Sequence, residues 1–491
     1  MSNRVRYAPS PTGKQHIGGL RTALFNYFFA KTTGGQFILR IEDTDRERYK
    51  DDALKDIFDT FEWLGIEWDE GPQKEGPYGP YFQSQRKELY IKFAETLVEN
   101  NFAYYCYCSQ ERIDNIRESQ VKEKSNIGYD RKCRNLSESE KDKLRSQNLI
   151  PVIRLKVPLE GKTHFHDELL GDIYRRNEDI SSDPVILKSD GFPTYHLANV
   201  VDDHLMQISH ILRSQEWIPS VPIHIIMYKA LGWTPPKFCH LPLVMGKDGQ
   251  KLSKRHGSTS IIEFREQGYL PEAIINYISL LGWSYDDKRE FFSLKELEKL
   301  FVLEKLNKSS AVFDYKKLQW FNGVYIRKKT TCEIKNLIIP YLIKDNLVGD
   351  PPSLDEEEKL NEITLLVHER LKIISDISNL VRFLFKDVEV QDIDLLIPKK
   401  LTLDKTFEIL QTNKELVMDF YSLSDEENEN KFRDKANKLE IKLSDILLPL
   451  RVAITGTNIS PPLFESLRIL GKEKTIKRIN QAISLLEKKK E

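Results

Sequence analysis

Cysteine, long apolar runs and net charge are all scarce in this sequence of 491 residues. Its five cysteines, three of which lie between positions 106 and 133, are too few for a disulfide framework and favour a reducing cytoplasm. No run approaches the roughly 18 apolar residues of a membrane-spanning helix, and no apolar secretion signal opens the chain. We therefore expect neither secretion nor insertion into a membrane.

Net charge is close to zero because 74 Lys and Arg residues balance 75 Asp and Glu residues. The chain as a whole therefore has no electrostatic attraction for nucleic acid, and any RNA contact must come from local basic patches. Internal repeats are also lacking. The length and a hydrophobic content of 40% indicate an ordinary globular protein with about three domains.

Strand and helix signals alternate over the first hundred residues, which predicts a parallel sheet wrapped by helices. We expect a buried strand at 36–41. Between 101 and 184, short β-rich pieces lie among charged helical stretches and indicate an insertion. The alternation resumes at Val185, and from about Glu263 the period is almost wholly helical.

The most informative stretch is RYAPSPTGKQHIGG, residues 6–19. A short apolar strand ending at Ala8 is followed by a proline-containing turn and by a long helix that opens at Gly18. Glycines at such a turn let backbone N–H groups approach a ligand, and a helix N-terminus favours negative charge. His16 lies at the same corner and is a candidate donor to a phosphate, although a lone histidine there is more often a loop residue.

A second segment, KLSKR at 251–255, follows a Gly-Lys-Asp-Gly turn and alone is most simply a solvated basic loop. Together the two segments resemble the paired signature of class I aminoacyl-tRNA synthetases, His-Ile-Gly-His and Lys-Met-Ser-Lys-Ser. Gly19 replaces the second histidine, Leu252 the methionine and Arg255 the final serine. These departures are usual for the glutamyl branch of that class.

Flanking segments narrow the resemblance: RIEDTD at 40–45, PTYHLANVVDDH at 193–204, and Glu216-Trp217. The sequence is similar to bacterial glutamyl-tRNA synthetases from its first residues to about Leu470. The resemblance implies a cytoplasmic, monomeric ligase that attaches L-glutamate to tRNA(Glu) through a glutamyl-adenylate, with release of AMP and pyrophosphate. It leaves open whether tRNA(Gln) is also charged.

The implied fold is an α/β Rossmann-type catalytic domain with an α+β insertion, followed by all-α C-terminal domains. The expected divisions are a first catalytic half (1–100), an acceptor-binding insertion (101–184), a second catalytic half (185–262), a connecting helical domain (263–326) and helical anticodon-binding domains (327–491). Two related enzyme families fit less well. A glutamyl-queuosine synthetase would end after the catalytic domain, and a glutaminyl enzyme would carry C-terminal β-barrels. A non-catalytic tRNA-binding relic should have lost its phosphate-handling residues.

Attack of a carboxylate on the α-phosphate of ATP builds negative charge on phosphate oxygens, which fixed cations stabilise. The resemblance assigns this catalytic work to His16, Lys251 and Lys254. Gly18 and Glu216 join them in the expected ATP site. We expect Mg²⁺ to accompany the nucleotide.

A glutamate substrate carries two carboxylates and an ammonium group. Arg6 and Arg213 are candidates for binding the carboxylates, because a guanidinium matches a carboxylate bidentately, and Glu42 is the candidate for the ammonium. By resemblance, the amino-acid pocket also includes the following residues: Ala8, Ser10, Tyr195 and Asn199.

Other polar residues near these motifs have simpler interpretations. We expect Arg40 and Arg46 to form a surface ion-pair network outside the site. We expect His204 to be a hydrogen-bonded loop residue and not a metal ligand paired with Asp203.

Three cysteines and a tyrosine form a candidate metal site. Cys106 and Cys108 share one face of a strand, and Tyr129 and Cys133 would share a face of a helical turn. Three thiolates and one further ligand make a closed, structural Zn²⁺ site. The pattern resembles the zinc knob of some glutamyl and glutamyl-queuosine synthetases, in which a tyrosine oxygen is the fourth ligand.

Two alternatives to this site stay open. His164 or His166 would serve as the fourth ligand in place of Tyr129, or the cysteines are ordinary buried thiols. Cys239 and Cys332 are expected to be isolated core residues. Near the C-terminus, basic residues are candidates for phosphate contacts, although a solvated helix face is equally consistent with them: Lys472, Lys474, Lys477 and Arg478.

Overall fold

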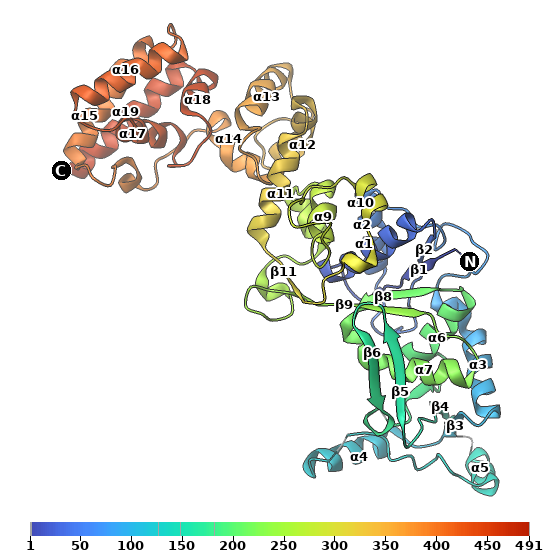
Figure 1. The fold of residues 1–491 in the computed structure, drawn as a ribbon. Helices are drawn as coiled ribbons and strands as arrows, with labels where there is room; N and C mark the ends of the chain where they lie inside the picture. The colour runs from blue at the N-terminus through green and yellow to red at the C-terminus, as the bar shows by residue number, and fades with distance from the viewer. Residues whose placement is uncertain (1, 126, 148, 181, 491) are drawn as a thin grey trace. The chain divides into compact units, whose positions relative to one another are not determined.

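The computed structural model describes residues 2–125, 127–147, 149–180 and 182–490, except for the side chain of Lys254. The chain forms two compact units (Figure 1). Residues 1–265 and 271–315 make up the first unit, and residues 266–270 and 316–491 the second. None of the helices formed by the described residues combines the length and the hydropathy that a bilayer crossing requires.

Parallel strands form the centre of the first unit. β1 (Arg4–Tyr7) pairs with β2 (Gln36–Leu39), and β8 (His210–Ser214) pairs with β9 (Lys237–Leu241). The Ser209 N–H donates to the Arg4 carbonyl at 2.9 Å, so β8 begins beside β1. Strand order therefore reverses between β1 and β8, which is the point where open α/β sheets bind ligands. The predicted Rossmann-type fold is confirmed.

Helix α1 (Ile17–Thr32) has apolar residues on all sides, and other elements cover it on all sides. It packs against β1, β2 and β8, and also against α9 (Pro271–Ser279) and α10 (Leu294–Leu300). Phe25 and Phe28 are both almost fully buried in this packing. The helix that follows the opening motif is therefore fixed on several sides by the sheet and by α9 and α10.

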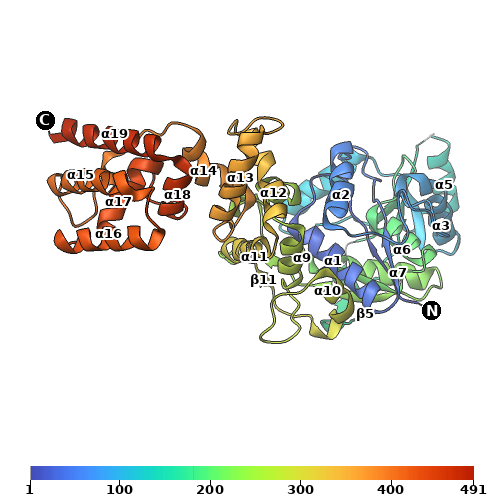
Figure 2. The ribbon, with the colours of Figure 1, turned by 90° about the horizontal axis from the view of Figure 1, so that it is seen from above.

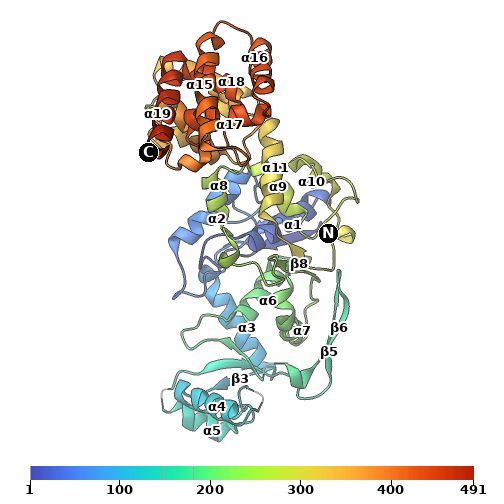
Figure 3. The ribbon, with the colours of Figure 1, turned by 90° about the vertical axis from the view of Figure 1, so that its left-hand side faces the viewer.

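The segment between residues 101 and 184 contributes to two sheets. β3 (Ala103–Cys106), β4 (Val152–Leu155) and β7 (Val185–Leu187) form an antiparallel sheet of their own. The hairpin of β5 (Lys162–Asp167) and β6 (Gly171–Arg176), whose strands lie side by side in Figure 3, instead joins the catalytic sheet through β9. Sequence patterns predicted the insertion but not this second attachment.

The remaining elements of the first unit connect and cover these sheets. They are α2 (Asp51–Leu64), α3 (Lys87–Glu99), α4 (Gln110–Lys122), α5 (Glu138–Arg145), α6 (Tyr195–Leu205), α7 (Val221–Ala230), β10 (Val244–Met245), α8 (Ile261–Gln267, which continues into the second unit) and β11 (Ala311–Val312). β10 pairs in parallel with β11.

The second unit is helical, as predicted, and no strand occurs between residues 316 and 490 (Figure 2). Its helices are α11 (Tyr315–Arg327, beginning in the first unit), α12 (Thr331–Lys344), α13 (Leu354–Val367), α14 (Ile377–Phe385), α15 (Leu403–Phe420), α16 (Asp425–Lys438), α17 (Leu443–Thr455), α18 (Leu463–Leu470) and α19 (Lys472–Lys490). Capping boxes begin three of them, at Thr330, Ser353 and Ser424, and satisfy amide donors that a helix start leaves unpaired.

Candidate functional site

The two sequence motifs meet at one corner of the first unit. Backbone hydrogen bonds of 3.0 and 3.1 Å join residues 15–17 to residues 259–261, just beyond the KLSKR segment. Lys251 Nζ forms an ion pair with Glu216 Oε1 at 2.5 Å, and both charges act on His16. The structure thus brings His16, Lys251 and Glu216 together at the carboxyl ends of β1 and β8.

The His16 imidazole caps helix α1. Its Nδ1 accepts hydrogen bonds from the N–H groups of Gly18 (3.1 Å) and Gly19 (3.3 Å), so Nε2 carries the ring proton. Desolvation by the surrounding protein lowers the pKa of His16 most, and the Lys251 ammonium lowers this pKa further, which keeps the ring neutral. The glycine amides expected to face a ligand are therefore occupied by the imidazole, and His16 Nε2 is left as a donor at this corner.

Lys251 lies on the returning arm of a tight hairpin. Gly249 turns the chain with a φ of 72°, a left-handed conformation that favours glycine. Asp248 contacts His256 Nε2 at 3.0 Å and so ties the hairpin to the 3-10 turn over 254–256. Lys254 begins that turn, and its side chain lies outside the described part of the structure.

Arg213 is a buried cation whose hydrogen-bond partners are all neutral. It is 5% exposed, and burial lowers its pKa. Nε donates to His240 Nε2 (3.1 Å), Nη1 to the Tyr195 hydroxyl (2.7 Å) and Nη2 to the Trp217 carbonyl (3.5 Å). Among the described residues, no carboxylate forms an ion pair with it. A buried charge normally has a counter-ion, so this guanidinium is suited to an anionic ligand.

Arg6 differs from Arg213 because it already has a carboxylate partner. Its Nε and Nη2 donate to Asp203 at 2.9 and 3.2 Å. Arg40 also donates to Asp203 (2.7 Å) and reaches Glu42 at 3.3 Å. Burial raises the pKa of Glu42, and Arg40 and then Arg6 oppose that rise. The carboxylate of Glu42 thus contacts the Arg40 guanidinium, and the charge of Arg6 also acts on it.

The expectation that Arg40 lies on the surface is wrong, because its side chain is 0% exposed. It directly follows β2, and its side chain is buried at the end of that strand. Arg46, four residues after Glu42, has an exposed side chain, as expected. His204 is not a hydrogen-bonded loop residue either. It lies on α6, and its ring stacks on Trp233 at 3.8 Å.

Asn199 has the properties of a ligand-binding amide. It is 1% exposed, and neither its amide nitrogen nor its oxygen has a hydrogen-bond partner among the described residues. Buried polar atoms are rarely left unpaired, so a ligand is the natural partner. The two predicted pocket residues at the end of β1 are more open: Ala8 is half-buried and Ser10 is exposed.

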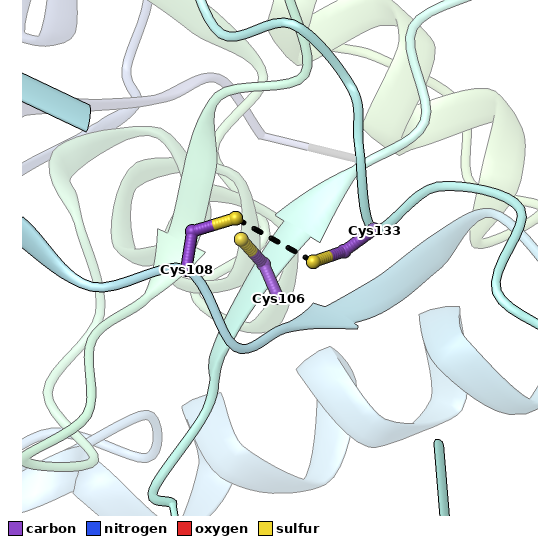
Figure 4. Close-up of side chains that lie close together, drawn as sticks. All are labelled: Cys106, Cys108 and Cys133. Carbon is purple, nitrogen blue, oxygen red and sulfur yellow. Dashed lines mark hydrogen bonds between the residues drawn. The ribbon is translucent and has the colours of Figure 1, made fainter. Parts of the chain in front are cut away.

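Three thiols and a phenol converge in the insertion. The sulfur atoms of Cys106, Cys108 and Cys133 all lie within 4.8 Å of one another (Figure 4). Cys108 and Cys133 are 3.6 Å apart, and the Tyr129 hydroxyl is 3.4 and 3.5 Å from Cys106 and Cys108. A tetrahedral Zn²⁺ ion bonded at usual lengths separates its ligands by about 3.8 Å (S to S) and about 3.6 Å (S to O). The four side chains therefore fit such an ion.

Comparisons with known proteins agree with this geometry. A family model described as the catalytic domain of class I tRNA synthetases (E and Q) matches residues 2–320, and an anticodon binding domain model matches residues 333–483. Glutamate–tRNA ligases of Treponema denticola and Borreliella burgdorferi are each 54% identical to the chain, over 99% of it and 99% of their own length. This chain belongs to the glutamate–tRNA ligase family.

A solved structure supports the same membership. The glutamate tRNA ligase of Elizabethkingia meningosepticum, crystallised in complex with its amino acid, is 36% identical with a TM-score of 0.83, over 99% of this chain and 100% of that one. The enzyme class predicted from the motifs is confirmed. The helical second unit and its anticodon-domain match exclude a glutamyl-queuosine enzyme, and the absence of strands from 316 to 490 excludes glutaminyl-type β-barrels.

Two details predicted for the cysteines of this family member are wrong. Tyr129 and Cys133 do not share a helical turn, because Arg131 between them has a φ of 61°. They meet instead through a hydrogen bond of 2.9 Å from the Cys133 N–H to the Tyr129 hydroxyl. Of the two isolated cysteines, Cys239 is buried as expected, but Cys332 is exposed.

The histidine alternatives for the fourth ligand are also excluded. His164 and His166 lie on β5, outside the cysteine cluster, and each contacts Asp172, at 2.9 and 3.0 Å. The side chains of all three are largely exposed. Tyr129 is the residue that the fold brings to the thiols.

Sequence reasoning missed two buried polar residues that lie behind the candidate site residues. His240 is 0% exposed and contacts Arg213, and Asp202 accepts hydrogen bonds from Arg86 (2.7 Å) and Tyr90 (2.8 Å). A polar residue inside the otherwise apolar strand at 238–241 was the available signal for His240. Its partner, 27 residues away, was not readable from spacing.

Proposed function

We propose that the chain attaches L-glutamate to tRNA(Glu) in two steps. The α-carboxylate of glutamate attacks the α-phosphate of ATP, which forms glutamyl-adenylate and releases pyrophosphate. The terminal ribose hydroxyl of the tRNA then attacks the activated carbonyl and releases AMP. The observation that carries this proposal is Arg213, a buried guanidinium without a carboxylate partner among the described residues.

Arg213 is suited to the side-chain carboxylate and not to the reacting one. The α-carboxylate loses its charge when the adenylate forms, whereas the γ-carboxylate stays charged through both steps. A buried guanidinium therefore keeps its counter-ion throughout only if it binds the γ-carboxylate. Tyr195, held by Arg213 at 2.7 Å, and the unpartnered amide of Asn199 add neutral hydrogen bonds.

The other end of glutamate faces the residues near β1 and β2. Glu42 is the carboxylate that binds the ammonium group, and Arg6 lies beside it with its charge largely balanced by Asp203. Ala8 and Ser10 complete the pocket at the end of β1. This arrangement supplies an anion for the ammonium and a cation for the γ-carboxylate, as the substrate requires.

ATP binds at the corner of His16 and the KLSKR segment. His16 Nε2 donates to the phosphates, and the ammonium groups of Lys251 and Lys254 stabilise the charge that develops on pyrophosphate. Glu216 holds Lys251 at 2.5 Å, so this ion pair opens when the lysine binds the phosphates. Gly18 leaves room here, because a Cβ on it would lie 3.1 Å from the His16 ring. Mg²⁺ bound with the nucleotide would offset negative charge on the phosphates.

Cys106, Cys108, Cys133 and Tyr129 bind a structural Zn²⁺. The thiol separation of 3.6 Å supports this proposal, because it is too long for a disulfide and close to the edge of a zinc tetrahedron. A closed set of four protein ligands leaves no open position for substrate. The ion would therefore stabilise the insertion and take no part in the reaction.

The wider assignments follow from this reaction. We propose a cytoplasmic monomer in which residues 1–100 and 185–262 carry the chemistry, residues 101–184 hold the acceptor end of the tRNA and residues 327–491 bind its anticodon, with 263–326 connecting them. Light scattering after size exclusion tests the monomer. A mass twice that of the 57.4 kDa chain would contradict it.

The decisive experiment is ATP–pyrophosphate exchange with glutamate, measured with and without tRNA. We expect exchange that depends on glutamate and requires tRNA(Glu). Charging assays on separated tRNA(Glu) and tRNA(Gln) then define the RNA substrate. Exchange supported by glutamine but not by glutamate would reject the proposed function.

A further inference from the structure

Three residues on neighbouring strands form a chain of contacts behind the glutamate pocket. Arg213 on β8 stands directly opposite His240 on β9, and Asp167 ends β5. Arg213 is 5% exposed and the other two are 0% exposed. The contacts run from Asp167 Oδ2 to His240 Nδ1 (2.6 Å) and from His240 Nε2 to Arg213 Nε (3.1 Å).

The proton positions in this chain follow from its donors and acceptors. Asp167 also accepts hydrogen bonds from the backbone N–H groups of Leu169 (3.0 Å), Leu170 (2.9 Å) and His240 (3.0 Å). Burial raises the pKa of Asp167, but the His240 ring and these amides hold it below its usual value. An ionised carboxylate only accepts hydrogen bonds, so His240 Nδ1 carries the proton.

His240 must therefore be neutral, with Nε2 as an acceptor. A guanidinium only donates hydrogen bonds, so the bond of 3.1 Å from Arg213 Nε ends on the lone pair of Nε2. A doubly protonated ring would set an N–H against this N–H. Burial is the main reason that the pKa of His240 is lowered, which favours the neutral ring.

The remaining donors of Arg213 define how it presents itself to a ligand. Of its five N–H groups, His240 takes the one on Nε, Tyr195 takes one on Nη1 and the Trp217 carbonyl, at 3.5 Å, takes one on Nη2. One hydrogen on Nη1 and one on Nη2 are left to form a two-donor fork. We propose that His240, oriented by Asp167, is a positioning residue that aims this fork at the γ-carboxylate of glutamate. This inference rests on the proposed function of the site.

Two substitutions at position 240 separate positioning from simple packing. His240→Asn keeps an amide donor near the position of Nδ1, facing Asp167, but leaves no acceptor for Arg213. His240→Gln brings an amide oxygen to the position of Nε2 and so restores an acceptor for Arg213. Both are measured in the full chain by tRNA charging, with separate titrations of glutamate and ATP.

We expect His240→Asn to raise the KM for glutamate at least tenfold, with the KM for ATP within about twofold of the parent value. His240→Gln should recover most of the glutamate KM. A packing role alone predicts that both variants lose thermal stability and change both KM values together. An unchanged glutamate KM in folded His240→Asn, or no recovery in His240→Gln, would overturn the inference.

A third variant carries the test if His240→Asn does not fold. Asp167→Asn keeps the size of the side chain but allows the amide to donate to Nδ1, which moves the ring proton to Nε2 and against Arg213. It should show the same selective rise in the glutamate KM, and equal changes in both KM values would contradict the proposal. Failure of the parent protein to charge tRNA with glutamate rejects the proposed function itself. An active parent with unaffected variants rejects only the roles of His240 and Asp167.

Discussion

The two units of this glutamate–tRNA ligase family member differ in what they bury. Of the buried Asp, Glu, Lys and Arg side chains that the structure describes, all but Arg478 belong to the first unit. Nine of the ten histidines are there as well, and the second unit has only His368. The second unit instead buries apolar side chains together with small hydroxyl and amide groups.

Arg478 is the exception in the second unit. Its guanidinium donates to the carbonyls of Ile454, Phe383 and Lys386, where α17 and α14 end. It therefore completes backbone hydrogen bonding, and both alternatives offered for Arg478, a phosphate contact and a solvated helix face, are wrong. The neighbouring candidates Lys472, Lys474 and Lys477 are exposed and keep that role as a prediction.

The comparison relates the burial of charge in each unit to the kind of ligand that the unit binds. A small charged substrate must be enclosed, so its site needs buried ions whose desolvation is offset by partners or by the ligand. An RNA backbone is contacted at a surface, where cations stay hydrated until they bind. Buried charge therefore marks the catalytic unit, and a well-capped apolar bundle marks the unit proposed to bind the anticodon.

The largest expected effect comes from removing the unpaired guanidinium. Arg213→Gln should lower kcat/KM for glutamate by about a thousandfold or more, equivalent to about 4 kcal/mol, because it leaves the γ-carboxylate of the substrate without a counter-ion. The KM for ATP should change far less. Charging assays with varied glutamate and varied ATP measure both.

Arg478→Gln is the matched control for that prediction. It removes the one buried cation described in the second unit, so it should lower the melting temperature and leave the glutamate KM unchanged. If both arginine variants raised the glutamate KM equally, buried charge would not distinguish the two units.

Metal content tests a second property of the first unit. Protein purified without added zinc should contain about one Zn²⁺ per chain, and Cys108→Ser should contain less than half of that, because three ligands rarely hold a structural ion. Plasma emission spectrometry measures the metal. Cys332→Ser alters an exposed thiol in the second unit and should keep its zinc. Less than half an equivalent in the parent protein would reject the site.

Acid should destabilise the first unit before the second. Burial is the main reason that the pKa values of five histidines in the first unit are lowered, that of His196 to about 4: His196, His204, His210, His224 and His240. Unfolded histidines titrate near 6.5, so between about pH 6.5 and 4 the unfolded chain binds more protons than the folded one. The free energy of unfolding should fall as pH falls through that window, by at most about 1.4 kcal/mol per pH unit per histidine.

Hydrogen exchange followed by mass spectrometry reports on each unit separately. Protection, corrected for the intrinsic rate, should fall more in α6 and α7 than in α15 and α17 between pH 7 and pH 5. Equal losses in both units would contradict the assignment of acid sensitivity to these histidines.

The smallest effect should come from a helix cap in the second unit. Ser424→Ala removes the side chain that accepts from the Glu427 amide and should cost about 1 kcal/mol of stability. Urea unfolding measures the loss. Because the change is local to one helix start of the second unit, kinetics with glutamate should be unaltered. A change in the glutamate KM would contradict the assignment of glutamate binding to the first unit alone.

Sequence patterns predicted the Rossmann-type sheet, the helical second unit and the convergence of Cys106, Cys108, Cys133 and Tyr129. They failed where the residues next to a position in the sequence do not indicate its surroundings in the folded structure. Arg40 lies in a run of charges typical of a surface, yet its side chain is 0% exposed because the run follows a buried strand. The spacing of Tyr129 and Cys133 indicated a helical turn, but a left-handed residue between them sets the geometry.

The sequence by itself determined which chemical groups are present and where helices begin and strands pair, because caps, turns and apolar periods depend on residues a few positions apart. Only the tertiary structure decided which charges are neutralised. Arg6 meets Asp203 across 197 positions, whereas Arg213 meets only neutral groups among the described residues. Electrostatic pairing depends on distance in space and on exclusion of water, and neither is encoded by spacing along the chain.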